Sequence, residues 1–394
     1  MGLNSTPSGE RLTIGFFGAR NAGKSSIVNA VTNQSISVVS DTPGTTTDPV
    51  KKSMELLPIG PVTIIDTPGL DDEGSLGDER VKVSRRILAS VDAAVLVIDA
   101  SCGMSDFDKE LLEDIKARGI PYITVYNKLD LAEVKENGIY VSAKSGDGID
   151  ALKAKMAEEF SQKENGKRIV SDILPKGSLA VLVIPIDEAA PKGRIILPQQ
   201  QTIRDLLDNG CMCICCQPSE LTSVLASLNK KPDIVITDSQ VFAKVSSLLP
   251  DDIQLTSFSI LFARYKGELE TLVNGAYAIS DLKDGDTVLI SEGCTHRRSC
   301  KDIGTVKLPA LIRKYTQKEL NFKFTSGGEF EDDLSDVALV LHCGGCMLTE
   351  KEMKYRMSIC SQYKKPIVNY GVAIAHMNGI LKRTTSMFSE ITHK

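Results

Sequence analysis

The stretch Gly18-Ala19-Arg20-Asn21-Ala22-Gly23-Lys24-Ser25 matches the phosphate-loop pattern GxxxxGK[ST] at every fixed position. An apolar run at 11–19 leads into it, and a helical pattern at 24–32 follows. Backbone N–H groups of such a loop wrap phosphate oxygens, because the loop and the helix N-terminus both present positive dipole ends. The stretch therefore predicts a nucleotide phosphate site at the start of an α/β domain.

Strand-like and helical runs alternate through the first 160 residues, which indicates a largely parallel sheet. Further strands are expected at 62–66, 93–99 and 122–126, and helices at 81–89, 106–118 and 149–160. The polar stretch 161–167 has the composition of a linker. We therefore place a first domain, a P-loop GTPase domain, at residues 1–163.

Two side chains of the loop have defined chemical roles in this pattern. Lys24 supplies a positive charge to the β- and γ-phosphates, and Ser25 offers a hydroxyl to Mg²⁺. The residues expected to hold GTP from this segment are Asn21, Ala22, Gly23, Lys24, Ser25 and Ser26.

The segment Asp66-Thr67-Pro68-Gly69 follows a predicted strand, as the second nucleotide motif should. Asp66 is expected to orient a Mg²⁺-bound water, and the N–H of Gly69 to contact the γ-phosphate. Leu70 comes next, where some GTPases carry a glutamine that orients water. A leucine cannot do this, so we expect slow turnover.

The base-specific motif is Asn127-Lys128-Leu129-Asp130, at the end of another predicted strand. The Asp130 carboxylate would accept from N1–H and N2–H₂ of guanine, and adenine lacks that pair of donors. A site whose hydrogen-bond acceptor matches one base in this way discriminates against the wrong base by a factor on the order of 10⁴. Ser142-Ala143-Lys144 follows as a backbone cradle for the base. These motifs, in this order, predict a GTP site.

Gly44-Thr45-Thr46-Thr47-Asp48 lies between the phosphate loop and Asp66, where a switch threonine is expected. The segment resembles the TrmE–Era branch of GTPases. That resemblance implies that Thr46 contacts Mg²⁺, with the two adjacent threonines as alternatives. It also implies that Asn21 coordinates a K⁺ ion and that K⁺ stimulates turnover; a simple loop-capping role for Asn21 is the alternative.

The rest of the chain predicts two further α/β units. In the second, strands are expected at 179–184, 211–216 and 233–237, and helices at 201–209 and 220–229. In the third, strands are expected at 287–290, 336–341 and 366–369, and helices at 308–318 and 351–362. We place these domains at 175–268 and 269–394. The alternating cysteines of 211–216 are expected to pack in the core as small hydrophobic side chains.

Two short segments near the C-terminus, Cys294-Thr295-His296 and His342-Cys343-Gly344-Gly345-Cys346, combine thiols and imidazoles. Each follows a predicted strand, and open α/β sheets form ligand crevices at the carboxyl ends of their strands. The spacing indicates a metal or iron–sulfur site. A structural zinc site and buried, unliganded thiols are the alternatives.

Composition limits the other possibilities. The net charge of −5 gives no indication of the positively charged surface with which proteins bind nucleic acid. The sequence shows neither an apolar run of 18 residues nor a signal peptide, and its ten cysteines without secretory features suit a reducing compartment. We therefore expect a cytoplasmic protein without a membrane or nucleic-acid partner.

A GTPase of this branch followed by Cys-x-His and His-Cys-x-x-Cys resembles the HydF family, the GTPases that mature [FeFe]-hydrogenases. The resemblance covers the whole chain. It implies a [4Fe–4S] cluster on Cys294, Cys343 and Cys346, with His296 or His342 as candidate for a labile fourth ligand. It also implies a homodimer formed through the middle domain.

The role implied by this resemblance is a scaffold. It would receive a diiron unit with CO and cyanide ligands from radical-SAM maturases and transfer it to apo-[FeFe]-hydrogenase. Two other hypotheses remain: a tRNA- or ribosome-associated GTPase with structural zinc, and an electron-transfer or redox-sensing module with a GTPase switch. The acidic balance disfavours the former, and a histidine-containing ligand set disfavours the latter.

Overall fold

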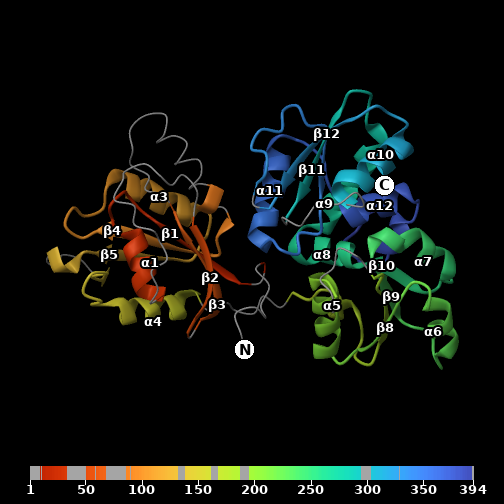
Figure 1. Cartoon of the computed structure of the whole chain (residues 1–394), viewed down its shortest axis with the longest axis horizontal. Coiled ribbons are helices and arrows are strands. Elements are labelled where there is room, and N and C mark those ends of the chain that lie inside the picture. The colour runs from red at the N-terminus through yellow and green to blue at the C-terminus, as the bar shows by residue number, and fades with distance from the viewer. Residues whose placement is uncertain are drawn as a thin grey trace. The chain divides into compact units, whose positions relative to one another are not determined.

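The computed structural model of the 394-residue chain is shown in Figure 1. It describes residues 9, 11–32, 50–57, 59–67, 86–88, 90–131, 138–160, 167–186, 195–293, 303–327 and 329–392. The chain divides into two compact units, residues 1–165 and 166–394. Among the helices of the described residues, none is both long enough and apolar enough to cross a bilayer.

The first unit is an α/β sheet with helices on both faces. Its described strands are β1 (Leu12–Phe17), β2 (Val50–Leu56), β3 (Gly60–Asp66), β4 (Ala93–Asp99), β5 (Tyr122–Asn127) and β6 (Ile139–Tyr140). Its helices are α1 (Lys24–Thr32), α3 (Asp106–Ala117) and α4 (Ile149–Phe160). The strand order is β2-β3-β1-β4-β5-β6, and only β2 runs antiparallel to its neighbour.

Two apolar clusters cover the two faces of this sheet, because successive side chains of a strand point to opposite faces. Ile14 and Phe16 pack with α1 and α4 on one face, whereas Phe17 packs with α3 on the other. The helix α3 begins with a capping box between Ser105 and Asp108. The central strands β1 and β4 are thereby buried on both faces, and the loops after them meet at one edge of the sheet.

The second unit contains two four-stranded parallel sheets. The elements of the first are β7 (Leu179–Val183), β8 (Met212–Cys216), β9 (Ile234–Thr237), β10 (Gln254–Ser257), α5 (Leu197–Asp208), α6 (Leu221–Ser227), α7 (Phe242–Leu248) and α8 (Phe258–Lys266). Those of the second are β11 (Thr287–Glu292), β12 (Asn321–Ser326), β13 (Leu339–His342), β14 (Ile367–Asn369), α9 (Leu269–Tyr277), α10 (Leu308–Thr316), α11 (Glu350–Gln362), α12 (Tyr370–Met377) and α13 (Leu381–Thr385).

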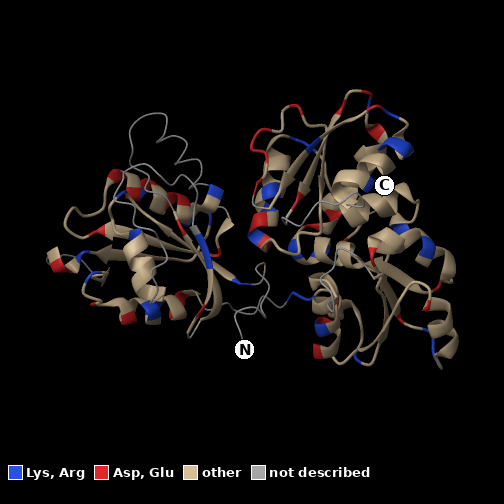
Figure 2. Cartoon of the chain, viewed as in Figure 1, with Lys and Arg blue, Asp and Glu red and all other residues tan. Residues whose placement is uncertain are grey.

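These two sheets share one continuous apolar core, which runs from Ile169 to Phe388. The strand orders are β10-β9-β7-β8 and β12-β11-β13-β14. The helix α8 joins the sheets: its Arg264 forms a two-point ion pair with Asp172 and a further ion pair with Glu390. Figure 2 shows basic and acidic residues interspersed over the elements of both units.

Several expected elements differ from the structure. The strands β2, β10 and β12 and the helices α8, α9 and α12 were not anticipated, and α5 begins at Leu197 rather than at 201. Core packing of the cysteine-rich strand is correct for Cys211 and Cys216 but wrong for Cys215, which is exposed. The physical reason is that successive side chains of a strand point to opposite faces, so Cys215 and Cys216 lie on opposite faces of β8, and β8 is the edge strand of its sheet.

Candidate functional sites

The phosphate loop connects β1 to α1 and has the backbone conformation that this pattern requires. Gly18 and Gly23 have φ angles of 139° and 88°, and Asn21 has a left-handed φ of 61°. A Cβ on Gly18 would lie 2.1 Å from the carbonyl oxygen of Val97, so only glycine fits there. Lys24 Nζ donates to the carbonyls of Gly18 and Ala19 at 2.9 and 2.8 Å, which holds the ammonium over the loop.

Asp66 stands beside the loop, at the end of β3. Ser25 Oγ donates to Asp66 Oδ2 at 2.5 Å, and burial raises the pKa of the Asp66 carboxyl. Its other oxygen, Oδ1, is buried without a hydrogen-bond partner among the described residues. A hydroxyl and an unsatisfied carboxylate oxygen side by side suit a hydrated Mg²⁺ ion, which keeps water ligands and favours oxygen donors. Ser25 and Asp66 therefore fit the ion that a GTP site requires.

The base-binding motif lies at the ends of β5 and β6, beyond the phosphate loop. Asn127 Nδ2 donates to the Ala22 carbonyl at 2.9 Å, and Asn127 Oδ1 accepts from the N–H of Ala143 at 3.1 Å. The buried Asn127 side chain thus connects the phosphate loop to the loop of Ala143, which is expected to contact the base. Ser142 Oγ donates to Asp130 Oδ1 at 2.8 Å and orients that exposed carboxylate.

One residue of this site was missed in the sequence. Asp99 is the last residue of β4 and forms a 2.5 Å ion pair with Lys128. In the register of β4 and β5 it pairs with Asn127, the first residue of the base-binding motif. Its position at the carboxyl end of a central strand is the signal that points to it. Among the other expected residues, Ser26 and Lys144 are exposed. Thr46 and Gly69 lie outside the described residues, as does Leu70.

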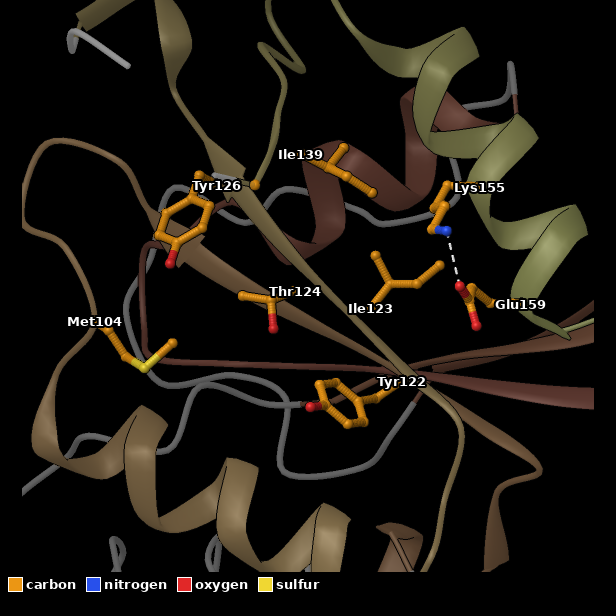
Figure 3. Close-up of a pocket in the computed structure, with 9 residues that line it drawn as sticks. Met104, Tyr122, Ile123, Thr124, Tyr126, Ile139, Lys155 and Glu159 are labelled. Atoms are coloured by element: carbon orange, nitrogen blue, oxygen red, sulfur yellow. Dashed lines mark ion pairs between the residues drawn. The ribbon is translucent and has the colours of Figure 1, made fainter. Parts of the chain in front are cut away.

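Figure 3 shows a separate hollow in the first unit, with a volume of about 330 Å³. It is lined along β5 by Tyr122 and Tyr126 and on α4 by the ion pair of Lys155 with Glu159. None of its lining residues belongs to the nucleotide motifs, so the GTP site is a different surface.

The cysteine segment after β13 lies at the carboxyl ends of β11 and β13, which are neighbours in the sheet β12-β11-β13-β14, called the third sheet below. Cys343 Sγ accepts hydrogen bonds from the N–H groups of Gly293 and Gly345, at 3.0 and 3.4 Å. Gly345 has a φ of 63°, so the chain turns sharply between the two cysteines. Burial raises the pKa of Cys343 to about 11 and also raises that of Cys346.

A buried lysine stabilises the turn that contains Cys346 by donating hydrogen bonds to its carbonyl groups. Lys266, the last residue of α8, donates to the carbonyls of Cys346 and Leu348 at 3.0 and 2.6 Å, and to that of Gly345 at 3.4 Å. Its positive charge opposes the effect of burial on the pKa of Cys346. Sequence reasoning missed Lys266, because nothing in the sequence around it indicates a contact 80 residues away.

His342 is fully buried. Arg356 Nη1 donates to His342 Nε2 at 3.0 Å, and His342 Nδ1 contacts the Cys343 carbonyl at 2.8 Å. A guanidinium can only donate and a carbonyl can only accept, so Nε2 is the acceptor and Nδ1 carries the proton. Burial and Arg356 lower the pKa of His342 to about 3. Neither ring nitrogen is free for an iron ion, which argues against His342 as the fourth ligand.

The remaining members of the proposed cluster set, Cys294 and His296, lie outside the described residues. Within the described part of the chain, no three side chains of His, Cys, Asp or Glu gather as a metal site. The two cysteines that are described fit a cluster: both residues are half-buried, and Cys343 receives two N–H donors of the kind that tune iron–sulfur sites.

The fold and the first site define a GTPase domain, and the comparisons agree. Residues 13–128 match a family model described as 50S ribosome-binding GTPase. Residues 169–267 match the hydrogen maturase F dimerization domain, and residues 270–387 match the hydrogen maturase F tetramerization domain. The chain belongs to the hydrogen maturase F family of hydrogenase-maturation GTPases.

Curated relatives match the GTPase part. The tRNA modification GTPase MnmE of Nitrosomonas europaea is 31% identical over 165 residues, which is 40% of this chain and 36% of that protein. GTPase Der of Kosmotoga olearia is 33% identical over 171 residues, 37% of this chain and 38% of that protein. The chain thus spans little more than a third of the length of these relatives.

A solved structure of Era in complex with MgGDPNP and nucleotides of 16S ribosomal RNA matches 57% of this chain and 90% of its own, at 19% identity and a TM-score of 0.35. At that score the superposition adds nothing to the assignment.

Proposed function

We propose that this chain is a GTP-binding scaffold that carries a [4Fe–4S] cluster on Cys294, Cys343 and Cys346. Its cargo would be a diiron unit, received from radical-SAM maturases and delivered to apo-[FeFe]-hydrogenase in the cytoplasm. When bound, the cluster supplies an iron with an exchangeable ligand position, to which incoming cargo can bridge. Membership in the hydrogen maturase F family supports the maturation role.

The observation that carries the proposal is the environment of Cys343. Its sulfur accepts from the N–H of Gly293, and Cys294 is the next residue in the chain. Cys346 follows after a glycine turn, and Lys266 places a positive charge under that turn. Clustered thiolates repel one another, and both N–H donors and a nearby ammonium offset that repulsion.

We assign GTP, Mg²⁺ and K⁺ to the first unit, with Ser25 and Thr46 for Mg²⁺ and Asn21 for K⁺. With Leu70 in the water-orienting position, hydrolysis is slow. We propose that the nucleotide biases exchange between partners rather than driving cluster chemistry, because ordering of switch segments changes contact surfaces.

Anaerobic purification, metal analysis and electron paramagnetic resonance test the cluster. We expect iron and sulfide with a reduced [4Fe–4S] signal, lost in Cys343→Ser and kept in Cys360→Ser, a buried cysteine elsewhere in the same unit. Zinc without iron would instead favour the second candidate, a tRNA- or ribosome-associated GTPase with structural zinc.

Delivery is tested separately. Chain loaded with the diiron unit should activate apo-[FeFe]-hydrogenase, and loaded Cys343→Ser chain should not. A wild-type chain that holds its cluster but never activates the hydrogenase would refute the carrier role while leaving the cluster assignment intact.

A further inference from the structure

The ion pair between Asp99 and Lys128 joins the end of β4 to the base-binding motif. Asp99 Oδ1 accepts hydrogen bonds from the N–H and the Oγ of Ser101, at 2.9 and 2.6 Å. Asp99 Oδ2 accepts from Lys128 Nζ at 2.5 Å. The side chains of Asp99 and Lys128 are 19% and 30% exposed, so solvent screens their attraction less than it screens a fully exposed pair.

The Asp99 carboxylate is charged at neutral pH. Burial alone would raise the pKa of this carboxyl, but the hydrogen bonds from Lys128 and Ser101 outweigh burial and lower the pKa below its usual value. Asp99 is therefore an anion that neutralises the Lys128 ammonium. In this pair Lys128 is not a free charge for the phosphates of a nucleotide, a role that belongs to Lys24.

Lys128 has a backbone conformation that needs support from its surroundings. Its φ of 67° lies in the left-handed region, where a residue other than glycine persists only when surrounding contacts hold it. The Lys128 carbonyl accepts from the N–H of Leu131 at 2.9 Å, and the short 3₁₀ helix Leu129–Leu131 follows directly. The ion pair with Asp99 ties the Lys128 side chain to the end of β4 while the backbone makes this turn.

Asp130, the residue expected to bind guanine, lies within this 3₁₀ helix. Asp130 is exposed, and Ser142 Oγ donates to its Oδ1 at 2.8 Å. Ser142 therefore sets the direction of the carboxylate, whereas the turn at Lys128 sets the position from which it projects. Because hydrogen bonds weaken steeply away from their preferred geometry, a shift of the turn would weaken both bonds to guanine.

We propose that Asp99 is a positioning residue for guanine recognition: by pairing with Lys128 it fixes the turn that carries Asp130. In this role Asp99 touches neither the base nor the phosphates and acts through Lys128. The inference concerns the first unit and does not depend on the iron–sulfur scaffold role. An ion pair that only stabilises the domain is the simpler explanation, and it predicts no change in the choice between bases.

The test compares Asp99→Asn with Asp106→Asn in the full-length chain. Asp106→Asn is the matched control, because Asp106 forms an exposed ion pair with Lys109 in the same unit. Isothermal titration calorimetry measures the binding of GDP, of a non-hydrolysable GTP analogue and of the inosine nucleotide IDP. Inosine lacks the N2 amino group, so IDP can donate to Asp130 only through N1–H.

We expect Asp99→Asn to weaken binding of GDP and of the GTP analogue equally, by about tenfold, since both carry the same base. The preference for GDP over IDP should fall by roughly threefold, because the two-point match to guanine loses more than the one-point match to inosine. This ratio does not depend on the fraction of folded chain. The turnover rate at saturating GTP should stay at the wild-type value while KM rises.

A double-mutant cycle shows whether Asp99 acts through Lys128. In a Lys128→Met background, Asp99→Asn should change GDP affinity by less than about twofold. Lys128→Met alone breaks the same ion pair and should also reduce the preference for GDP over IDP, which keeps the proposal testable if Asp99→Asn does not fold.

Three results would overturn the proposal. The first is a preference for GDP over IDP that is unchanged in Asp99→Asn or, where that variant does not fold, in Lys128→Met. The second is tighter binding of the GTP analogue in Asp99→Asn, which would mean that the released Lys128 ammonium acts on the phosphates. The third is a loss of GDP affinity that persists in the Lys128→Met background or that Asp106→Asn reproduces.

Discussion

At the scale of single residues, Asn21 is the residue of the phosphate loop that has a strained backbone conformation although it is not a glycine. Its φ of 61° lies in the left-handed region, which asparagine tolerates better than other side chains except glycine. Substitution by glycine therefore keeps the backbone and removes only the amide. This makes Asn21→Gly a clean test of the proposed K⁺ ligand.

For the wild-type chain we expect GTP turnover in K⁺ to exceed that in Na⁺ by roughly tenfold, which corresponds to about 1.4 kcal/mol of barrier. Asn21→Gly should turn over at the same slow rate in both salts, with nucleotide affinity little changed. Steady-state phosphate release in matched KCl and NaCl measures this. Equal wild-type rates in the two salts would exclude K⁺ as an activator.

Lys266 is the second residue whose role follows from its contacts. Its ammonium is buried beneath the cysteine turn and close enough to Cys346 to affect that thiol. A positive charge stabilises the more negative, reduced state of a bound cluster. In Lys266→Met we expect the ratio of reduced to oxidised cluster at a fixed potential to fall about tenfold, a shift of ~59 mV to lower potential.

Redox titration followed by electron paramagnetic resonance checks this expectation, with Lys244→Met as the matched control, since Lys244 is an exposed lysine of the same domain. An unchanged midpoint in Lys266→Met, with iron content equal to wild type, would show that the lysine only supports the loop.

At the scale of elements, α11 and the strand ends of the third sheet are joined through one guanidinium. Arg356 is fully buried and donates to Glu352 on its own helix, to Ser291 on β11, to His342 on β13 and to the Gly327 carbonyl. Removing one partner of a buried charged network leaves the others unsatisfied. Arg356 thus fixes the ends of β11 and β13, from which the cysteine segments emerge.

We expect Arg356→Met to lower the free energy of unfolding of the second unit by about 3–5 kcal/mol. The matched control is Lys354→Met on the same helix, where the exposed Lys354 pairs with the half-buried Glu350 and should contribute less than about 1 kcal/mol. Urea unfolding monitored by hydrogen exchange in β11 and β13 gives both values. Similar losses in the two variants would mean that the buried network contributes no more than a surface ion pair.

At the scale of the whole molecule, the chain divides into two units with separate sites. The nucleotide motifs lie in residues 1–165, and the Cys343 segment lies in a unit whose two sheets share one core. The two sites should therefore respond independently to substitutions in their own units. Lys24, which lies over the phosphate loop, provides the test.

We expect Lys24→Ala to reduce GTP turnover by on the order of 10²-fold or more, because a preorganised charge at the transferring phosphate is lost. Iron content and the cluster signal should be unchanged. Phosphate release and iron analysis on one preparation measure both. Loss of iron together with turnover would show that the two units are coupled in folding.

The sequence by itself determined the GTPase domain and its motifs, because each motif is a short run of fixed spacing at the end of a strand that its own residues specify. Three cysteines and their glycines were visible for the same reason. Only the tertiary structure decided which side chains surround them. Lys266, Ser291 and Arg356 act across long stretches of chain, and such contacts arise from packing that no local pattern records. The same reason explains His342, whose place in the sequence suggests a ligand and whose nitrogens are already engaged.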